Sequence, residues 1–269
     1  MLTAVPAGAG TLETPWTDGE GARARLIASS VIGPDGRPLL LAGLQIELDE
    51  GWKTYWRTPG DDGGMPPELD WDMSRNLSSV EALYPAPGRF KGIMGYAIGY
   101  KHAVVLPFVL DPASTDREVT FHLGVVYGVC KDICVPKEAE LAVALKPGET
   151  ASPEIRRVLE EAYAAVPARG GKGDGLPELV SSRRVEAEGG PALELVARYP
   201  AGSEGADLFV EAVDFSYVPV PEKVASEGDT VTYRVDLSKA DEPAAEPGAR
   251  LRVTMVSGTG GREVALKAP

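Results

Sequence analysis

Cys130 and Cys134 are the residues of this chain whose type and spacing best suit chemistry, and the chain has no other cysteine. Three residues separate them in the stretch VCKDICV. Strand-like runs precede the first and follow the second, which predicts a hairpin with one cysteine at each end of its loop. Residues opposite each other on antiparallel strands lie about 4.5–5.5 Å apart at Cα, within the range that a disulfide can bridge. A helix would also bring them close, but Gly128 and Pro136 disfavour it.

A structural disulfide, a metal site and a redox-active dithiol are three interpretations of this pair. A bridge that closes so short a loop removes only about 2 kcal/mol of unfolded-state entropy in the chain-entropy model, so it stabilises little. Tight bridges tend to be strained, and strain makes a disulfide easier to reduce. Lys131 favours the thiolate of the neighbouring Cys130, although Asp132 opposes it. These arguments favour the redox dithiol and leave the other two interpretations open.

Copper(I) binding, or a role in copper tolerance, is the alternative function for the same cysteines, because two thiolates suit Cu(I). Soft or borderline candidate ligands nearby in the sequence are Met65, Met73, Met94, His102 and His122. None of them stands at a regular ligand spacing from the cysteines, and a zinc site normally shows paired histidines. The redox interpretation requires no metal and no organic cofactor.

Composition and charge restrict the other classes of function. The formal net charge of −13 argues against nucleic acid and anionic lipid as partners. A serine hydrolase is not expected, because the sequence has no GxSxG elbow and only two isolated histidines. The opening MLTAVPAGAG lacks the features of a secretory signal, so we expect any export signal to have been removed. The best apolar stretch, AVVLPFVL, is far shorter than the roughly 20 residues of a transmembrane helix.

The first half of the chain reads as strands. Leu44, Ile46 and Leu48 alternate with polar residues, which is the period of a half-buried strand. Strands are expected at 23–32, 38–50, 101–110, 118–129 and 138–145. The stretch 57–71 is rich in glycine and proline and is expected not to form a central strand. The glycines of GRFKGIMGYAIGY indicate a close-packed loop.

A helix and a glycine-rich connector then divide the chain. Ser152 is a natural N-cap, and apolar residues such as Ile155 and Leu159 recur after it at helical spacing. Strand patterns return from about residue 176. We therefore predict an all-β chain of two immunoglobulin-like β-sandwich domains joined by a short helix and a glycine-rich linker. The predicted segments are a redox domain at 1–148, the helix and linker at 149–175, and a second, cysteine-free sandwich at 176–269.

Three stretches together resemble the N-terminal periplasmic domain of the DsbD family of transmembrane thiol–disulfide reductases. They are DEGWKTYWRTPGDDGGMPPELDW, GYKHAVVLPFVL and GVVYGVCKDICVPKEAEL. The TYWRTPGD stretch is most similar to the branch of the suppressor of copper sensitivity protein B (ScsB). The resemblance covers most of 20–146, and residues 176–269 fit, more diffusely, the extended N-terminal region of that branch.

The resemblance implies an immunoglobulin-like domain in the periplasm, tethered to the inner membrane in the full-length protein. It implies that Cys130 and Cys134 form a redox pair with protein-disulfide reductase activity. The electron donor would be the transmembrane domain of the same protein, which is fed by cytoplasmic thioredoxin. The acceptors would be periplasmic thioredoxin-fold or peroxiredoxin-like proteins. Lys131 and the family pattern favour Cys130 as the attacking sulfur.

The DsbD family also shields its cysteines with an acidic and aromatic cap loop. The corresponding stretch here, GRFKGIMGY, has no acidic residue, and three residues instead of five separate the cysteines. Tyr55 falls where the family places an aromatic residue beside its active site. The residues expected to support or shield the pair are Tyr55, Trp56, Phe90, Ile93, Met94, Tyr127 and Lys131.

Overall fold

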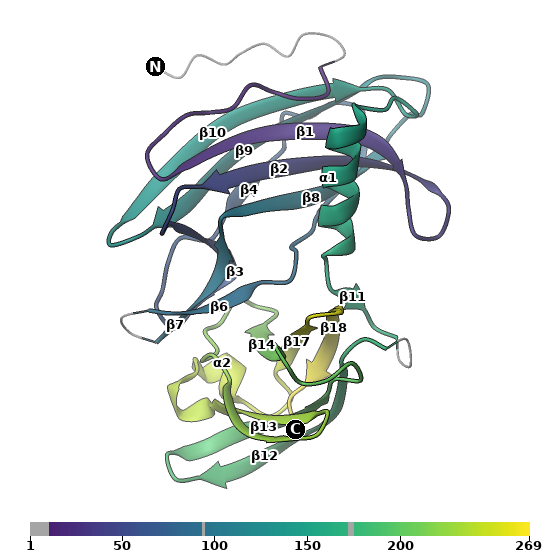
Figure 1. The fold of residues 1–269 in the computed structure, drawn as a ribbon. Helices are drawn as coiled ribbons and strands as arrows, with labels where there is room; N and C mark the ends of the chain where they lie inside the picture. Colours follow the sequence, from purple (N-terminus) through teal and green to yellow (C-terminus); the bar gives the residue numbers. More distant parts are fainter. Residues whose placement is uncertain (1–10, 93–94, 172–174) are drawn as a thin grey trace. The chain divides into compact units, whose positions relative to one another are not determined.

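The computed structural model of the chain describes residues 11–92, 95–171 and 175–269 and consists mostly of β-strands (Figure 1). It divides into two compact units. The first comprises the described residues up to Pro59, with Gly63–Phe90 and Ala97–Ala164, and the second comprises Gly60–Asp62, Lys91–Tyr96 and Ala165–Pro269. The all-β prediction is confirmed, and the domain boundaries at 148 and 176 stay predictions. No helix in the described part of the chain is long and apolar enough to cross a membrane.

The strands of the first unit form two sheets. One has the order β1-β2-β8-β5, and the other has the order β10-β9-β3-β7-β6 with β4 paired to β9. The bounds are β1 Ala22–Ile32, β2 Pro38–Leu48, β3 Lys53–Gly60, β4 Glu68–Asp70, β5 Leu77–Ala82, β6 Gly88–Lys91, β7 Tyr96–Lys101, β8 Ala103–Pro112, β9 Val119–Cys130 and β10 Cys134–Leu145.

Strand alternation builds the core between these two sheets. Along β9 every second side chain is buried, namely Val119, Phe121, Leu123, Val125, Tyr127 and Val129. The ring of Phe121 lies 5.2 Å from the ring of Phe108 on β8, centroid to centroid, so the two sheets meet through large apolar side chains. The other face of β9 is the outer face of its sheet, and it carries Cys130.

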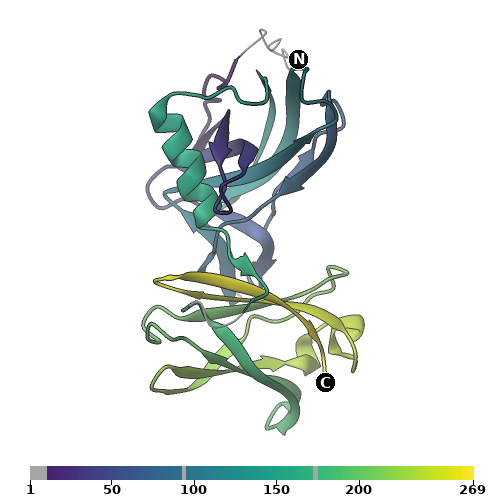
Figure 2. The same ribbon diagram turned by 90° about the vertical axis from the view of Figure 1, so that its right-hand side faces the viewer.

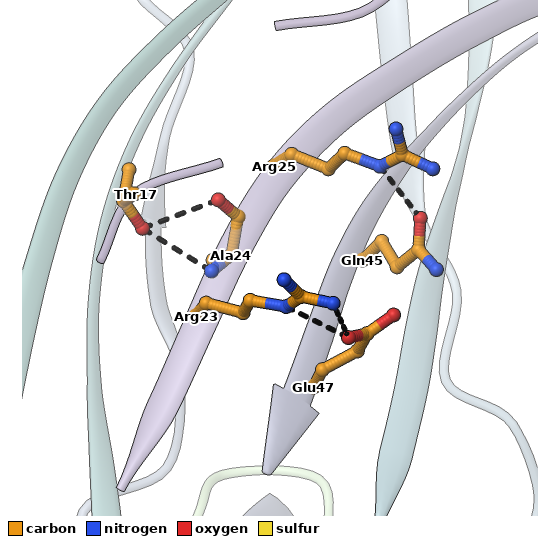
Figure 3. Close-up of polar contacts among 6 residues, drawn as sticks. All are labelled: Thr17, Arg23, Ala24, Arg25, Gln45 and Glu47. Atoms are coloured by element: carbon orange, nitrogen blue, oxygen red, sulfur yellow. Dashed lines mark hydrogen bonds and ion pairs between the residues drawn. The ribbon is translucent and has the colours of Figure 1, made fainter. Parts of the chain in front are cut away.

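The outer face of β1 and β2 pairs polar side chains by register. Arg23 lies opposite Glu47, and Arg25 lies opposite Gln45. Arg23 Nε donates to Glu47 Oε2 at 2.8 Å, and Arg25 Nε donates to Gln45 Oε1 at 2.9 Å (Figure 3). Exposed pairs of this kind stabilise only modestly, but they fix which face of β1 is turned outward.

Helix α1, Pro153–Ala164, covers part of the same sheet face. Ser152 Oγ accepts a hydrogen bond from the backbone N–H of Ile155, as predicted for the N-cap. Ile155 and Leu159 are buried against Ile27, Val31 and Leu41, so the helix is part of the first unit (Figure 1). A Cβ on Gly43 would lie 2.7 Å from Leu159, which explains a glycine in the middle of β2.

The second unit also contains two sheets, with the orders β11-β18-β17-β14 and β12-β13-β16-β15 (Figure 2). Its core takes side chains from both, and the hydroxyls of Tyr199 and Tyr233 lie 3.0 Å apart within it. The bounds are β11 Ala168–Arg169, β12 Glu178–Ala187, β13 Gly190–Arg198, β14 Asp207–Ala212, β15 Glu222–Glu227, β16 Thr230–Asp236, η1 Leu237–Lys239, α2 Glu242–Ala245, β17 Arg250–Ser257 and β18 Gly260–Lys267.

Two expectations about local structure were wrong. The stretch 57–71 contains the second half of β3, a middle strand of its sheet, and all of β4. The stretch 88–100, interpreted as a loop, contains β6 and most of β7. Glycine gave a loop signal in both stretches, and proline gave one in the first. In β3, however, pairing with β9 is at Lys53 and Thr54, well before Pro59.

Candidate redox site

The two cysteines stand at the two ends of a tight hairpin loop, as predicted. Cys130 is the last residue of β9, Cys134 is the first residue of β10, and the two are partners in the antiparallel register. Their Cα atoms are 4.1 Å apart, and the sulfurs form a disulfide. The backbone N–H of Lys131 donates to the carbonyl of Ile133 at 3.1 Å and tightens the loop between them.

The two sulfur-bearing residues differ sharply in exposure. Cys130 is 2% exposed, whereas Cys134 is exposed. Ile133, which precedes Cys134 at the tip of the hairpin, is 70% exposed. A large thiol-bearing partner therefore reaches Cys134 more readily than Cys130. This burial argues against the expectation that Cys130 is the attacking sulfur.

Tyr55 is the side chain that covers Cys130. Its hydroxyl donates a hydrogen bond to Cys130 Sγ at 3.0 Å and lies 3.5 Å from Cys134 Sγ. Tyr55 is 3% exposed and forms a buried cluster with Ala97 and Cys130. The register explains its place: Lys53 on β3 pairs with Cys130, and alternation puts Tyr55 on the same face two residues later.

A glycine-containing segment, Gly63–Met65, packs beside this tyrosine. A Cβ on Gly64 would lie 2.3 Å from the ring of Tyr55, so the backbone of the segment rests directly on the ring. The carbonyl of Met65 accepts a hydrogen bond from the N–H of Gly128 at 3.0 Å. A Cβ on Gly128 would lie 2.8 Å from the Cβ of Met65, so this close approach needs a glycine. Tyr55, Ala97 and this segment thus pack together beside Cys130.

Thr54 fixes the end of β9 from the neighbouring strand. Its side chain is 1% exposed, and its hydroxyl donates to the carbonyl of Gly128 at 2.8 Å. Gly128 therefore uses its N–H on Met65 and its carbonyl on Thr54. This network ties β3, the Gly63–Met65 segment and the end of β9 together, which holds Tyr55 and the disulfide in register.

Two of the other expected residues belong to the core. Tyr127 is 2% exposed and points to the inner face of β9, the face opposite Cys130. Burial raises the pKa of Tyr127 to about 12. Trp56 is 1% exposed and follows Tyr55 on the other face of β3, where the guanidinium of Arg57 lies 4.3 Å from the centre of its ring. Neither residue has a described contact with the sulfurs.

The remaining expected residues have other described contacts or lie outside the described residues. Phe90 on β6 stacks with Lys101, whose Nζ lies 4.5 Å from the ring centre. Lys131 directs its Nζ to the carbonyl of Glu50, at 3.4 Å. Ile93 and Met94 are outside the described residues. Among the expected residues that the structure describes, Tyr55 has hydrogen-bond contacts with both sulfurs.

The two histidines of the chain do not join the cysteines. His122 lies eight residues before Cys130 on the same strand, a distance of about 27 Å at the usual rise of a β-strand. Its Nε2 lies 3.5 Å from a carboxylate oxygen of Glu140. Across the described ranges, no group of three or more His, Cys, Asp or Glu side chains is arranged to hold a metal ion. No feature of the described site favours the copper alternative over exchange.

Comparison with known proteins shows what this hairpin domain is similar to. Residues 39–146 match the family model "Thiol:disulfide interchange protein DsbD, N-terminal". This segment of the chain is therefore similar to a DsbD N-terminal domain. The crystal structure of the N-terminal periplasmic domain of ScsB from Proteus mirabilis has a similar fold, with a TM-score of 0.72 and 23% sequence identity. That match covers 96% of this chain and 99% of the other. A comparison with curated proteins gives no match.

Sequence reasoning missed three residues of this candidate site. Lys53 pairs with Cys130 in register, Ala97 joins the buried cluster, and Gly64 supports the tyrosine ring. The alternation in GWKTYW was the available signal for Lys53, because it places positions 53 and 55 on one face. Ala97 and Gly64 reach the site through tertiary packing, for which the local sequence held no signal.

Proposed function

We propose that this DsbD-like domain is a thiol–disulfide exchange module in which Cys130 and Cys134 are the catalytic residues. The observation that carries the proposal is the pairing of one exposed sulfur, Cys134, with one buried sulfur, Cys130, in a disulfide at the tip of a hairpin. A bridge that only stapled the sandwich would gain nothing from an accessible sulfur, and its short loop stabilises little. An exchange reaction needs such access.

Reduction of the module begins at the exposed sulfur. A donor thiolate attacks Cys134 Sγ, the bond between Cys134 and Cys130 breaks, and Cys130 leaves as a thiolate with the electron pair. The donor's second thiolate then attacks the donor sulfur of the mixed disulfide and releases the Cys134 thiolate. The donor is now oxidised to a disulfide, and the module holds a dithiol.

Delivery of electrons to an acceptor is the same chemistry in the opposite direction. The Cys134 thiolate attacks one sulfur of the acceptor disulfide, and the other acceptor sulfur leaves as a thiolate. The Cys130 thiolate then attacks Cys134 Sγ, restores the internal disulfide and releases the acceptor as a dithiol. In this assignment Cys134 attacks and Cys130 resolves, which reverses the order that Lys131 suggested.

The proposed setting follows the family. The donor would be the transmembrane domain of the same full-length protein, and the acceptors would be periplasmic thioredoxin-fold or peroxiredoxin-like proteins. The similar domain from Proteus mirabilis ScsB is described as periplasmic, which supports the same location for this chain. We further propose that the full-length protein is tethered to the inner membrane and that the cysteine-free second unit adds partner surface or positions the first unit.

Trapping of mixed disulfides tests the proposal. The Cys130→Ser variant keeps the exposed Cys134 and lacks the resolving sulfur, so it is expected to accumulate disulfide-linked complexes with redox partners in periplasmic extract. The Cys134→Ser variant keeps only the buried Cys130 and serves as the matched control, with few complexes expected. Absence of reducible complexes from both variants would contradict the proposed function.

A further inference from the structure

The hydroxyl of Tyr55 is placed asymmetrically with respect to the two sulfurs. Its oxygen lies 3.0 Å from Cys130 Sγ, toward which it donates a hydrogen bond, and 3.5 Å from Cys134 Sγ. The nearer sulfur is the buried one. A tyrosine that served only as a cover needs its ring and not its hydroxyl, whereas here the hydroxyl is aimed at a sulfur inside a buried cluster.

The charge on Cys130 changes during exchange. In the disulfide its sulfur is a weak, neutral acceptor, but it becomes an anion when the bond breaks at an attack on Cys134. Hydrogen bonds to an ionised acceptor are about twice as strong as neutral ones. A donor that already points at Cys130 Sγ therefore stabilises the product of bond cleavage, and the transition state that leads to it, more than the starting disulfide.

The surroundings of Tyr55 keep this donor in place. The backbone of Gly64 rests on the ring, and a Cβ on Gly99 would lie 2.9 Å from the Cα of Tyr55, so both the ring and the backbone of Tyr55 are closely packed. Exposure of the side chain is only 3%, which limits competition from water for the hydroxyl. A preorganised donor loses little free energy to reorganisation when the anion forms.

The geometry points to Tyr55 as a catalytic residue that directs exchange to Cys134, a role that rests on the proposed function. When an incoming thiolate bonds to Cys134 Sγ, the disulfide breaks and Cys130 Sγ takes the electron pair as a thiolate. The Tyr55 hydroxyl donates its hydrogen bond to that thiolate and keeps its own proton. In the reverse step the same bond holds the Cys130 thiolate beside Cys134 until it closes the disulfide again.

The variant Tyr55→Phe tests this role, because it removes the hydroxyl and retains the ring. Tyr127→Phe is the matched control, since Tyr127 is equally buried but faces the opposite side of β9. Reduction of the purified chain by dithiothreitol is expected to be about tenfold slower in Tyr55→Phe, the effect of one hydrogen bond to a charged group. The control is expected to be reduced at the wild-type rate.

A titration provides the second measurement. In the Cys134→Ser background, the ultraviolet absorbance of the thiolate gives the pKa of Cys130, and adding Tyr55→Phe is expected to raise that pKa by about one unit. Adding Tyr127→Phe is expected to leave it unchanged. Both measurements are made on chains whose circular dichroism shows native folding.

An unchanged reduction rate or an unchanged Cys130 pKa in the Tyr55→Phe chains would overturn this inference and leave the tyrosine as a cover alone. The probe is a small thiol, so the result does not depend on finding a natural partner. Slower reduction in Tyr55→Phe together with a failure to trap any partner would contradict the proposed function and not the role of the hydroxyl.

Discussion

Gly64 lies so close to the ring of Tyr55 that a Cβ at this position would be 2.3 Å from the ring atom Cε1. The residue also has φ +142°, a conformation that side chains rarely adopt. The contact joins a loop segment to the residue that covers Cys130. Gly64 lies 66 residues before Cys130, and nothing in the local sequence indicates the contact. Substitution of Gly64 therefore tests this contact directly.

Gly64→Ala is expected to destabilise the first unit by about 1–3 kcal/mol, because the methyl group pushes against a buried ring. Gly63→Ala is the matched control: Gly63 also has a positive φ, +68°, but a Cβ there meets nothing within 4 Å. Urea unfolding followed by tryptophan fluorescence measures both. Equal losses in the two variants would mean that backbone strain, and not the contact with Tyr55, accounts for the effect.

Thr54→Val is expected to cost about 1–3 kcal/mol of folding stability, since it removes the hydroxyl that satisfies the buried carbonyl of Gly128. Thr254 offers a matched control, because it is also fully buried and its hydroxyl has no hydrogen-bond partner in the described structure. Thr254→Val is therefore expected to be neutral or stabilising. Urea unfolding of both variants measures the difference, and a neutral Thr54→Val would refute the network proposed for the end of β9.

The buried Tyr127 is expected to make the first unit less stable at alkaline pH. Burial raises its pKa in the folded chain from 10.0 to about 12, so the folded state favours the neutral phenol. The resulting contribution to the free energy of unfolding is complete below about pH 10 and is lost as the pH rises through about 12. The free energy of unfolding then falls by on the order of 2–3 kcal/mol. Unfolding measured across this range in the wild type and in Tyr127→Phe isolates it. Parallel pH profiles would contradict the assignment.

Ile133 is expected to contact redox partners, because it is 70% exposed and precedes the accessible Cys134 at the tip of the hairpin. Ile133→Ser is expected to slow exchange with a protein partner captured by the Cys130→Ser variant, by roughly the tenfold that a modest interface contact contributes. Its reduction by dithiothreitol is expected to stay at the wild-type rate. If protein and small-thiol rates fall together, Ile133 shapes the loop and does not bind the partner.

The hairpin and its disulfide were predictable because their determinants are local. Regular alternation along β9 and the apolar run after Cys134 place both cysteines at facing strand ends. The cover over Cys130 was not predictable from local pattern, since Gly64 and Ala97 reach Tyr55 only after β3, β7 and β9 have paired. No central strand was expected at 57–71, because Pro59 is typical of a strand break. The pairing of β3 with β9 ends at Thr54, before this proline.

Resemblance to the DsbD family supplied Tyr55, whose hydroxyl lies close to both sulfurs. The shielding expected from Phe90, Ile93 and Met94 stays a prediction, because Ile93 and Met94 lie outside the described residues. The order of attack also stays a prediction. Lys131 beside Cys130 suggested one order from sequence, but the exposure of each sulfur depends on which strands and loops lie over it, and that is a tertiary property.

The central claim is that the disulfide between Cys130 and Cys134 opens and closes in exchange. Its reduction potential, measured by equilibration of the purified chain with defined ratios of reduced and oxidised dithiothreitol, tests this most directly. The account predicts a value above about −300 mV, in the range of roughly −270 to −120 mV found for exchanging dithiols. A value below about −300 mV would identify a structural disulfide and contradict the account.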